Sequence, residues 1–143
     1  NLFDIDNTGS SLTCFDKKII LDIYKTIPIK YKTEIIKLDD FTTKNNIACI
    51  ELLKIDVEGY EFEVLKGALN LVYEKKINAI QFEFNTMNIY SKVFFKDFYD
   101  VLYKNYKLYR LLPDGLIQFN DYNPNYPIHC EIFAYQNIVA FLK

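Results

Sequence analysis

The sequence predicts a single α/β domain, and three observations support this prediction. A short apolar run from Leu52 to Val57 changes at Gly59 into an amphipathic helical pattern, which indicates a strand followed by a helix. The segment from Ile77 to Phe84 then alternates apolar and polar residues, as expected of a strand with one buried face. A chain of 143 residues with 50% hydrophobic content is large enough for one packed core.

The N-terminal third gives weaker signals. Residues 1–11 are rich in turn formers and indicate a loop. The segments from Lys17 to Ile27 and from Lys30 to Leu38 are rich in Ile, Tyr and Thr and are separated by Pro28. Because β-branched and aromatic residues favour strands, we expect two extended segments here.

Three helices are predicted. The first begins near Phe41, and we expect Asp39 or Asp40 to cap its free backbone N–H groups. The second, after Gly59, is a continuous helix whose apolar residues recur at helical spacing: Phe62, Leu65, Ala68, Leu69 and Val72. The third has the same spacing: Phe94, Phe95, Phe98, Val101 and Leu102.

The predicted strands on either side of the second helix form a crossover, which should be parallel and right-handed. In the later strand, Ile80, Phe82 and Phe84 are expected on one face. Two further strands, Tyr106 to Leu112 and Leu116 to Phe119, are joined by a turn at Pro113-Asp114-Gly115. The segment from Glu131 to Leu142 is expected to form one or two strands, with a break near Gln136.

Composition and charge exclude several classes of function. The formal net charge of −2 and the pI near 5.4 disfavour a nucleic-acid or acidic-membrane partner. No apolar run approaches the ~20 residues that span a bilayer, so we expect no membrane partner. Cys14, Cys49 and Cys130 are far apart and include no CxxC pair. We therefore interpret them as reduced packing residues of a cytoplasmic protein.

Acidic residues follow the Leu52 to Val57 strand at the end where open α/β sheets bind ligands. Asp56 and Glu58 have three readings besides simple capping of the next helix. Asp56 could be a phosphatase-type nucleophile, although no second paired-aspartate motif follows later in the chain. Both acids could hold a divalent cation with Glu83, but no full ligand set can be named, and we predict no metal. The third reading rests on a resemblance.

The block LLKIDVEGYEFEVLKGA, which runs from residue 52 to residue 68, is similar to the signature of the FkbM family of S-adenosylmethionine-dependent methyltransferases. The flanking pieces GSSL at 9–12, IKLDDF at 36–41, IQFEFN at 80–85 and the closing EIFAYQNIVAFL at 131–142 also resemble this family. The resemblance implies a Rossmann-like class I methyltransferase sheet. It also implies methyl transfer from S-adenosylmethionine to a small-molecule or glycan acceptor, usually at a hydroxyl.

The same resemblance implies roles for individual residues. Asp56 and Glu58 are expected to be catalytic, Asp56 and Gly59 to contact the cofactor, and Glu83 to contact the substrate. Methyl transfer is a nucleophilic displacement, so a carboxylate can remove the proton of the acceptor. A structural role for Asp56, binding loop N–H groups, is an equal alternative. His129, the only histidine, is expected to be a surface or packing residue.

The sequence departs from the family pattern in its glycines. Gly9, Gly59, Gly67 and Gly115 are not clustered, so no glycine-rich cofactor loop occurs in these 143 residues. We therefore expect residues 1–143 to be the C-terminal part of one methyltransferase domain, with a sheet incomplete at its N-terminal side. The rival hypothesis is a non-catalytic module that keeps the fold without the activity.

An incomplete sheet has a physical consequence. The Leu52 to Val57 strand would have an unpaired edge, with Lys54 as the one positive charge on it. We expect self-association through this edge, or coverage of it by the Lys30 to Leu38 segment.

Overall fold

The computed structural model describes residues 2–4, 12–15 and 17–143. The predicted loop at 1–11 and the GSSL match at 9–12 fall largely outside the described residues. The rest is mixed α/β, so the predicted Rossmann-like α/β class is confirmed.

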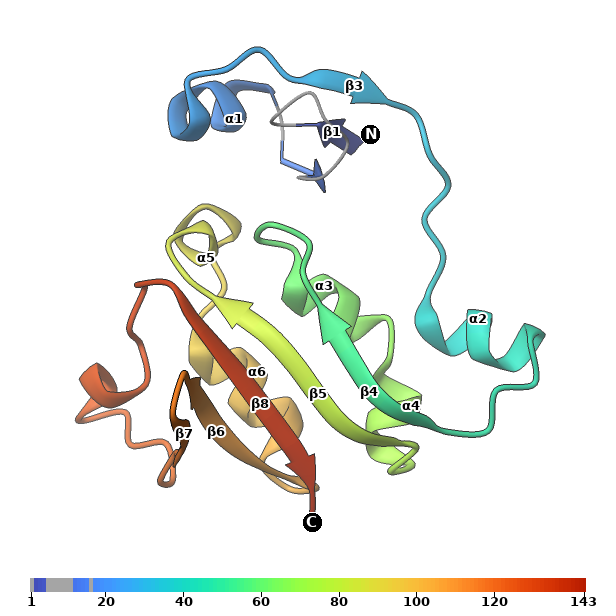
Figure 1. Ribbon diagram of the computed structural model, residues 1–143, viewed down its shortest axis with the longest axis vertical. Coiled ribbons are helices and arrows are strands. Elements are labelled where there is room, and N and C mark those ends of the chain that lie inside the picture. Colours follow the sequence, from blue (N-terminus) through green and yellow to red (C-terminus); the bar gives the residue numbers. More distant parts are fainter. Residues whose placement is uncertain (1, 5–11, 16) are drawn as a thin grey trace.

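The main sheet has five strands in the order β4-β5-β8-β6-β7 (Figure 1). β4 and β5 are parallel, whereas the other neighbouring pairs are antiparallel. The strands are β4 (Ile50–Ile55), β5 (Ile77–Phe84), β6 (Tyr106–Leu112), β7 (Gly115–Gln118) and β8 (Gln136–Leu142). The predicted parallel crossover and the β6–β7 hairpin are therefore confirmed. The C-terminal segment differs from the prediction, because a single strand begins at Gln136 where a break was expected.

Helices cover one face of this sheet (Figure 1). They are α3 (Glu61–Lys66), α4 (Leu69–Tyr73) and α6 (Phe95–Leu102), and α5 (Met87–Ser91) follows β5 at the carboxyl edge. The fully buried side chains beneath them include Leu65, Val72, Ile80, Phe82, Phe84, Phe98 and Ile138. Phe82 stacks on Phe98 of α6 with ring centroids 4.3 Å apart. The predicted inward face of β5 and the predicted third helix are thus confirmed.

The continuous helix predicted after Gly59 is wrong, since α3 ends at Lys66 and α4 begins at Leu69. The first predicted helix, α2 (Leu38–Lys44), begins earlier than expected, after Lys37. Asp39 does not cap it. Its carboxylate instead accepts hydrogen bonds from the N–H groups of Asn70 and Leu71, at 3.1 Å each, and so caps α4.

The N-terminal region forms a separate small layer (Figure 1). Its strands, in the order β2-β1-β3, are β1 (Leu2–Asp4), β2 (Leu12–Thr13) and β3 (Ile29–Tyr31). The extended segment predicted from Lys17 is wrong, because α1 (Lys17–Tyr24) is a helix. It packs Ile20, with Ile19 and Ile23 beside it, against Phe15 and Met87. Apolar residues at helical spacing outweighed strand propensity there, because they find a surface to bury against.

β4 is the edge strand of the main sheet, and it is the strand for which we expected an unpaired edge. It pairs with β5, with Ile55 opposite Phe82. The Lys30 to Leu38 segment does not cover it as a strand, because β3 pairs with β1 and the segment ends in α2. That part of the edge prediction is wrong, and self-association stays a prediction.

The three cysteines are free thiols, as predicted, but Cys49 is exposed and therefore does not pack in the core. Within the described residues no helix is long and apolar enough to cross a membrane.

Candidate active site

The candidate site begins where β4 ends, in a tight turn that leads into α3. Glu58 and Gly59 both have positive φ angles, of 50° and 98°. A side chain at Gly59 would collide with the ring of Phe15, since a Cβ there would be 2.6 Å from one ring carbon. The turn therefore requires glycine for two reasons, its backbone angle and its close contact with the N-terminal layer.

Glu61 fixes this turn from inside. The side chain is 2% exposed, and Oε1 accepts hydrogen bonds from the N–H groups of Val57 at 3.2 Å and Gly59 at 3.1 Å. Burial raises the pKa of Glu61, although these backbone hydrogen bonds oppose the shift. The loop-binding role that the sequence offered for Asp56 is thus performed by Glu61. This role of Glu61 could not be predicted, because the first turns of helices often carry glutamate for other reasons.

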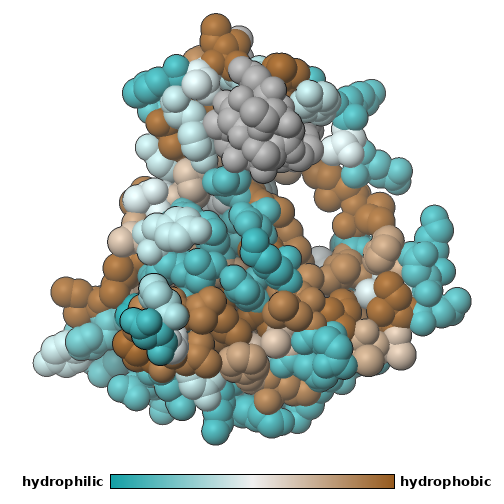
Figure 2. All heavy atoms as spheres, viewed as in Figure 1, coloured by the Kyte–Doolittle hydropathy of each residue, from teal (hydrophilic) through white to brown (hydrophobic). Residues whose placement is uncertain are grey.

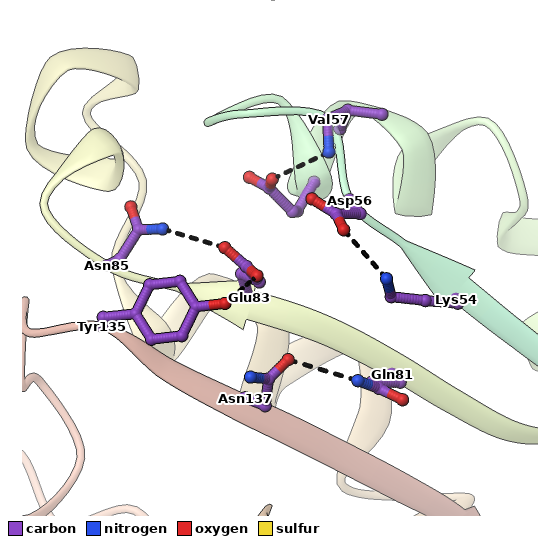
Figure 3. Close-up of polar contacts among 9 residues, drawn as sticks. Lys54, Asp56, Val57, Gln81, Glu83, Asn85, Tyr135 and Asn137 are labelled. Carbon is purple, nitrogen blue, oxygen red and sulfur yellow. Dashed lines mark hydrogen bonds and ion pairs between the residues drawn. The ribbon is translucent and has the colours of Figure 1, made fainter. Parts of the chain in front are cut away.

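Asp56 is directed away from the turn and toward the open face of the sheet (Figure 3). It is 44% exposed, and its Oδ2 accepts a hydrogen bond from Lys54 Nζ at 2.9 Å. This hydrogen bond and the charge of Asp56 raise the pKa of Lys54. Asp56 therefore lies beside a cation at the strand end, accessible to a ligand.

Glu83 lies on the neighbouring strand, one residue beyond the pair that joins Ile55 to Phe82. Its Oε1 accepts a hydrogen bond from the Tyr135 hydroxyl at 2.6 Å, and its Oε2 accepts one from Asn85 Nδ2 at 3.3 Å. The bond to Glu83 is the main cause of the raised pKa of Tyr135. Figure 3 shows Glu83 and Asp56 on neighbouring strand ends, with Tyr135 reaching Glu83 from the segment before β8.

Glu58, the other predicted catalytic acid, points elsewhere. Its Oε2 accepts a hydrogen bond from the Tyr24 hydroxyl at 3.2 Å, and its carbonyl oxygen accepts one from Thr13 Oγ1 at 3.0 Å. Burial, together with Glu58, raises the pKa of Tyr24. In this structure Glu58 joins the turn to the N-terminal layer.

An open groove lies between the segment from Ile35 to Phe41 on one side and β4 and α3 on the other. Its volume is about 750 Å³, and Asp56, Val57 and Glu58 are among the residues that line it. Leu53 and Leu38 contribute apolar walls. Figure 2 shows hydrophobic side chains gathered around the hollow on the side of α2.

Comparison of the chain with models of protein families identifies its family. The model of the FkbM methyltransferase domain matches residues 5–111, well over half of the chain. The chain belongs to the FkbM methyltransferase family. Comparison with curated proteins and with solved structures gave no match.

The FkbM match includes every predicted site residue, and the structure separates them into two groups. Asp56 and Glu83 lie together at the open strand ends, whereas Glu58 and Gly59 face the N-terminal layer. Tyr135 and Asn85 complete the polar group around Glu83 and were not predicted as site residues. Both residues lay within blocks that resemble the family, Asn85 in IQFEFN and Tyr135 in EIFAYQNIVAFL, and this was the usable signal.

Two other predictions concern His129 and a metal site. His129 is exposed in the short helix η1 (Pro127–His129), as predicted for a surface residue. In the described part of the FkbM chain, no group of three or more His, Cys, Asp or Glu side chains is arranged to hold a metal ion.

Proposed function

We propose that this chain carries the methyl-transfer end of an S-adenosylmethionine-dependent O-methyltransferase that acts on a hydroxyl of a small molecule or sugar. The observation that supports this proposal is the placement of Asp56 and Glu83 on neighbouring parallel strand ends, with Asp56 also lining the groove. Ligands of open α/β sheets bind at this edge.

The groove fits the chemistry of the cofactor. S-adenosylmethionine carries a positive sulfonium and a positive ammonium group, and the groove is lined by Asp56, Glu58 and Glu63 with Lys37 as its basic residue. Leu53 and the other apolar walls suit the uncharged part of the molecule. Asp56 and the backbone at Gly59 are the residues that we propose to contact it. The cofactor would supply an electrophilic methyl group.

The protein's own task is to position the acceptor hydroxyl and to take its proton. Asp56 is the proposed base, because it is exposed to the groove and is oriented by Lys54 at 2.9 Å. Glu83 is held by Tyr135 and Asn85, and we propose that it accepts a hydrogen bond from a second hydroxyl of the acceptor. The proton of the acceptor hydroxyl would pass to the Asp56 carboxylate, and the cofactor, which would supply the methyl group by cleavage of its sulfur–methyl bond, would leave as the neutral thioether S-adenosylhomocysteine.

The test is transfer of labelled methyl from S-adenosylmethionine to a panel of sugars, lipids and small natural products, using the full-length protein. Label in an acceptor that is lost with Asp56→Asn would support the proposal. No transfer to any acceptor, combined with no binding of S-adenosylmethionine to the full-length protein, would favour the non-catalytic module.

The isolated 143-residue chain should bind S-adenosylmethionine weakly, because its glycines are not clustered into a loop that can surround the cofactor. Calorimetric titration that gives low-micromolar affinity for this chain would contradict that expectation.

A further inference from the structure

A second cavity lies at the other end of the main sheet, beside β6 and β7. Its volume is about 520 Å³. It is enclosed largely by the segment between β7 and β8, residues 119–135, and by side chains of the β6–β7 hairpin. Arg110, Asn120, Asp121, Asn123 and Tyr126 are among its lining residues. None of these belongs to the site around Asp56.

Arg110 is the only arginine in the sequence, and its guanidinium group is held in place by neutral partners. Nε donates a hydrogen bond to Gln136 Oε1 at 2.6 Å, and one Nη donates to the His129 carbonyl oxygen at 3.2 Å. The group also lies over the Phe119 ring, 5.0 Å from its centroid. Gln136 is itself fixed, since its amide donates to the Ile132 carbonyl at 2.6 Å.

The charge of Arg110 has no acidic partner within salt-bridge distance in the described part of the chain, where lysines form all the ion pairs. An arginine side chain stays protonated and carries five N–H donors in a planar fork. Two of these bonds are accounted for by Gln136 and His129, so further donors remain at the cavity wall. The result is a pre-oriented cation that can receive an anion.

The rest of the cavity limits the kind of anion. Asn120 and Asn123 supply side-chain amides, which can hydrogen-bond to hydroxyl groups. Tyr126 is 66% exposed and offers an aromatic surface at the rim. Asp121 lines the same cavity and would repel a doubly charged phosphate more strongly than a singly charged carboxylate.

We propose that this cavity binds a carboxylated sugar, with the carboxylate on Arg110 and the ring hydroxyls on the neighbouring amides. A carboxylate matches the planar fork of arginine in a bidentate arrangement. This site is separate from the one proposed for the methyl acceptor.

The cavity and the candidate active site are close along the chain but are separate. Tyr135 and Gln136 are consecutive, and the first bonds to Glu83 while the second bonds to Arg110. Arg110 pairs with Ile138, which pairs with Phe82, so it lies one residue row inside the row that contains Glu83. Residues paired across a sheet point to the same face, so Arg110 shares the helix-covered face with Ile138 and Phe82, whereas Glu83 points to the open face. The cavity and the candidate active site therefore lie on opposite faces of the sheet.

The experiment is a titration of the chain with D-glucuronate, followed by NMR of the backbone amides and the Arg110 Nε–H signal, without methyl donor. We expect saturable shifts at Arg110 and Asn120, and no comparable shifts with D-glucose. Arg110→Gln should weaken binding at least about tenfold, as the loss of a charge-assisted pair does. Arg110→Lys should recover only part of the affinity, because lysine lacks the fork. Lys107→Gln, on the exposed face of the same strand, is the matched control and should leave affinity unchanged.

A second variant keeps the proposal testable if Arg110→Gln does not fold. Asp121→Asn removes the competing carboxylate but can still accept the Tyr99 hydroxyl, so it should tighten glucuronate binding about two- to fivefold. Equal binding of glucose, tighter binding of inorganic phosphate, or no shift at millimolar glucuronate would overturn the proposal. Since no methyl donor is present, failure of methyl transfer would leave this result unaffected.

Discussion

The two faces of the main sheet use alternate residues of the same strands for opposite purposes. On the face covered by helices, Phe82 and Phe84 of β5 are fully buried. On the open face, Gln81 and Glu83 of the same strand are partly exposed and bond to side chains of neighbouring segments, such as Asn137 at 3.2 Å. Because side chains alternate along a strand, one run of sequence encodes both faces.

The covered face therefore contributes mainly to stability, and the open face mainly to the proposed chemistry. The covered face contributes the burial of large apolar side chains, whose removal leaves cavities. The open face contributes half-exposed charged groups, whose pairs stabilise a fold little. Substitutions on the two faces should therefore affect different measurements.

The largest effect is expected from Phe82→Ala on the covered face. The side chain is fully buried and stacked on Phe98, so its loss should lower the free energy of unfolding by about 3–5 kcal/mol. Urea denaturation measures this, with Gln81→Ala on the open face as the matched control, for which we expect under about 1 kcal/mol. Equal losses of free energy of unfolding in both variants would contradict the claim that the covered face contributes more to stability than the open face.

The next effect concerns Glu61, which belongs to neither face. Glu61→Ala should cost about 3 kcal/mol, because it leaves the N–H groups of Val57 and Gly59 without their acceptor. Glu61→Gln keeps an acceptor oxygen and should stay within about 1 kcal/mol of the parent. If the alanine variant is as stable as the glutamine variant, the turn does not depend on these bonds.

Glu61 also predicts a pH dependence. Because burial raises its pKa in the folded state, the folded protein binds this proton more tightly than the unfolded chain does. Its contribution to stability is fully present below the unfolded pKa of a glutamate and is lost as pH rises through the raised folded pKa. The free energy of unfolding of the parent, measured by urea denaturation, should therefore decline over that pH window relative to that of Glu61→Gln. A constant difference between the two across the window would contradict the raised pKa.

On the open face, Asp56→Asn should leave stability within about 0.5 kcal/mol, because Asp56 is exposed and its ion pair with Lys54 is a surface pair. Turnover of the full-length enzyme should fall at least about tenfold, or roughly 1.4 kcal/mol of transition-state stabilisation. Steady-state kinetics on one acceptor measure this, with Asp100→Asn on α6, whose ion pair with Lys96 is also a surface pair, as control. Unchanged turnover would show that Asp56 is not the base.

The smallest effect is expected at the edge of the sheet. β4 is paired by β5 on one side, and Leu52 on it is 56% exposed. We expect weak self-association of the isolated chain, reduced by Leu52→Lys, since charged residues on an edge strand discourage pairing. Light scattering over a concentration series measures it, and a monodisperse monomer would rule out this edge as an interface.

The sequence by itself determined the parts of this protein that depend on local pattern. The alternation of Ile77 to Phe84 predicted β5 and its buried face, and the spacing from Phe94 to Leu102 predicted α6. The signature block located Asp56 at the end of β4 and pointed to the family. Periodicity and a contiguous motif need no knowledge of distant contacts, so a single chain is enough to read them.

Only the tertiary structure decided which polar groups meet. Asp39 caps α4 rather than its own helix, Glu61 rather than Asp56 binds the turn, and Tyr135 reaches Glu83 across 52 positions of sequence. It also made the Lys17–Tyr24 segment a helix, because Ile20 is fully buried next to Phe15 and Met87. The physical reason is common to all of these. A polar or apolar side chain takes the partner that folding brings within reach, and that partner is set by strand order and packing rather than by neighbouring residues.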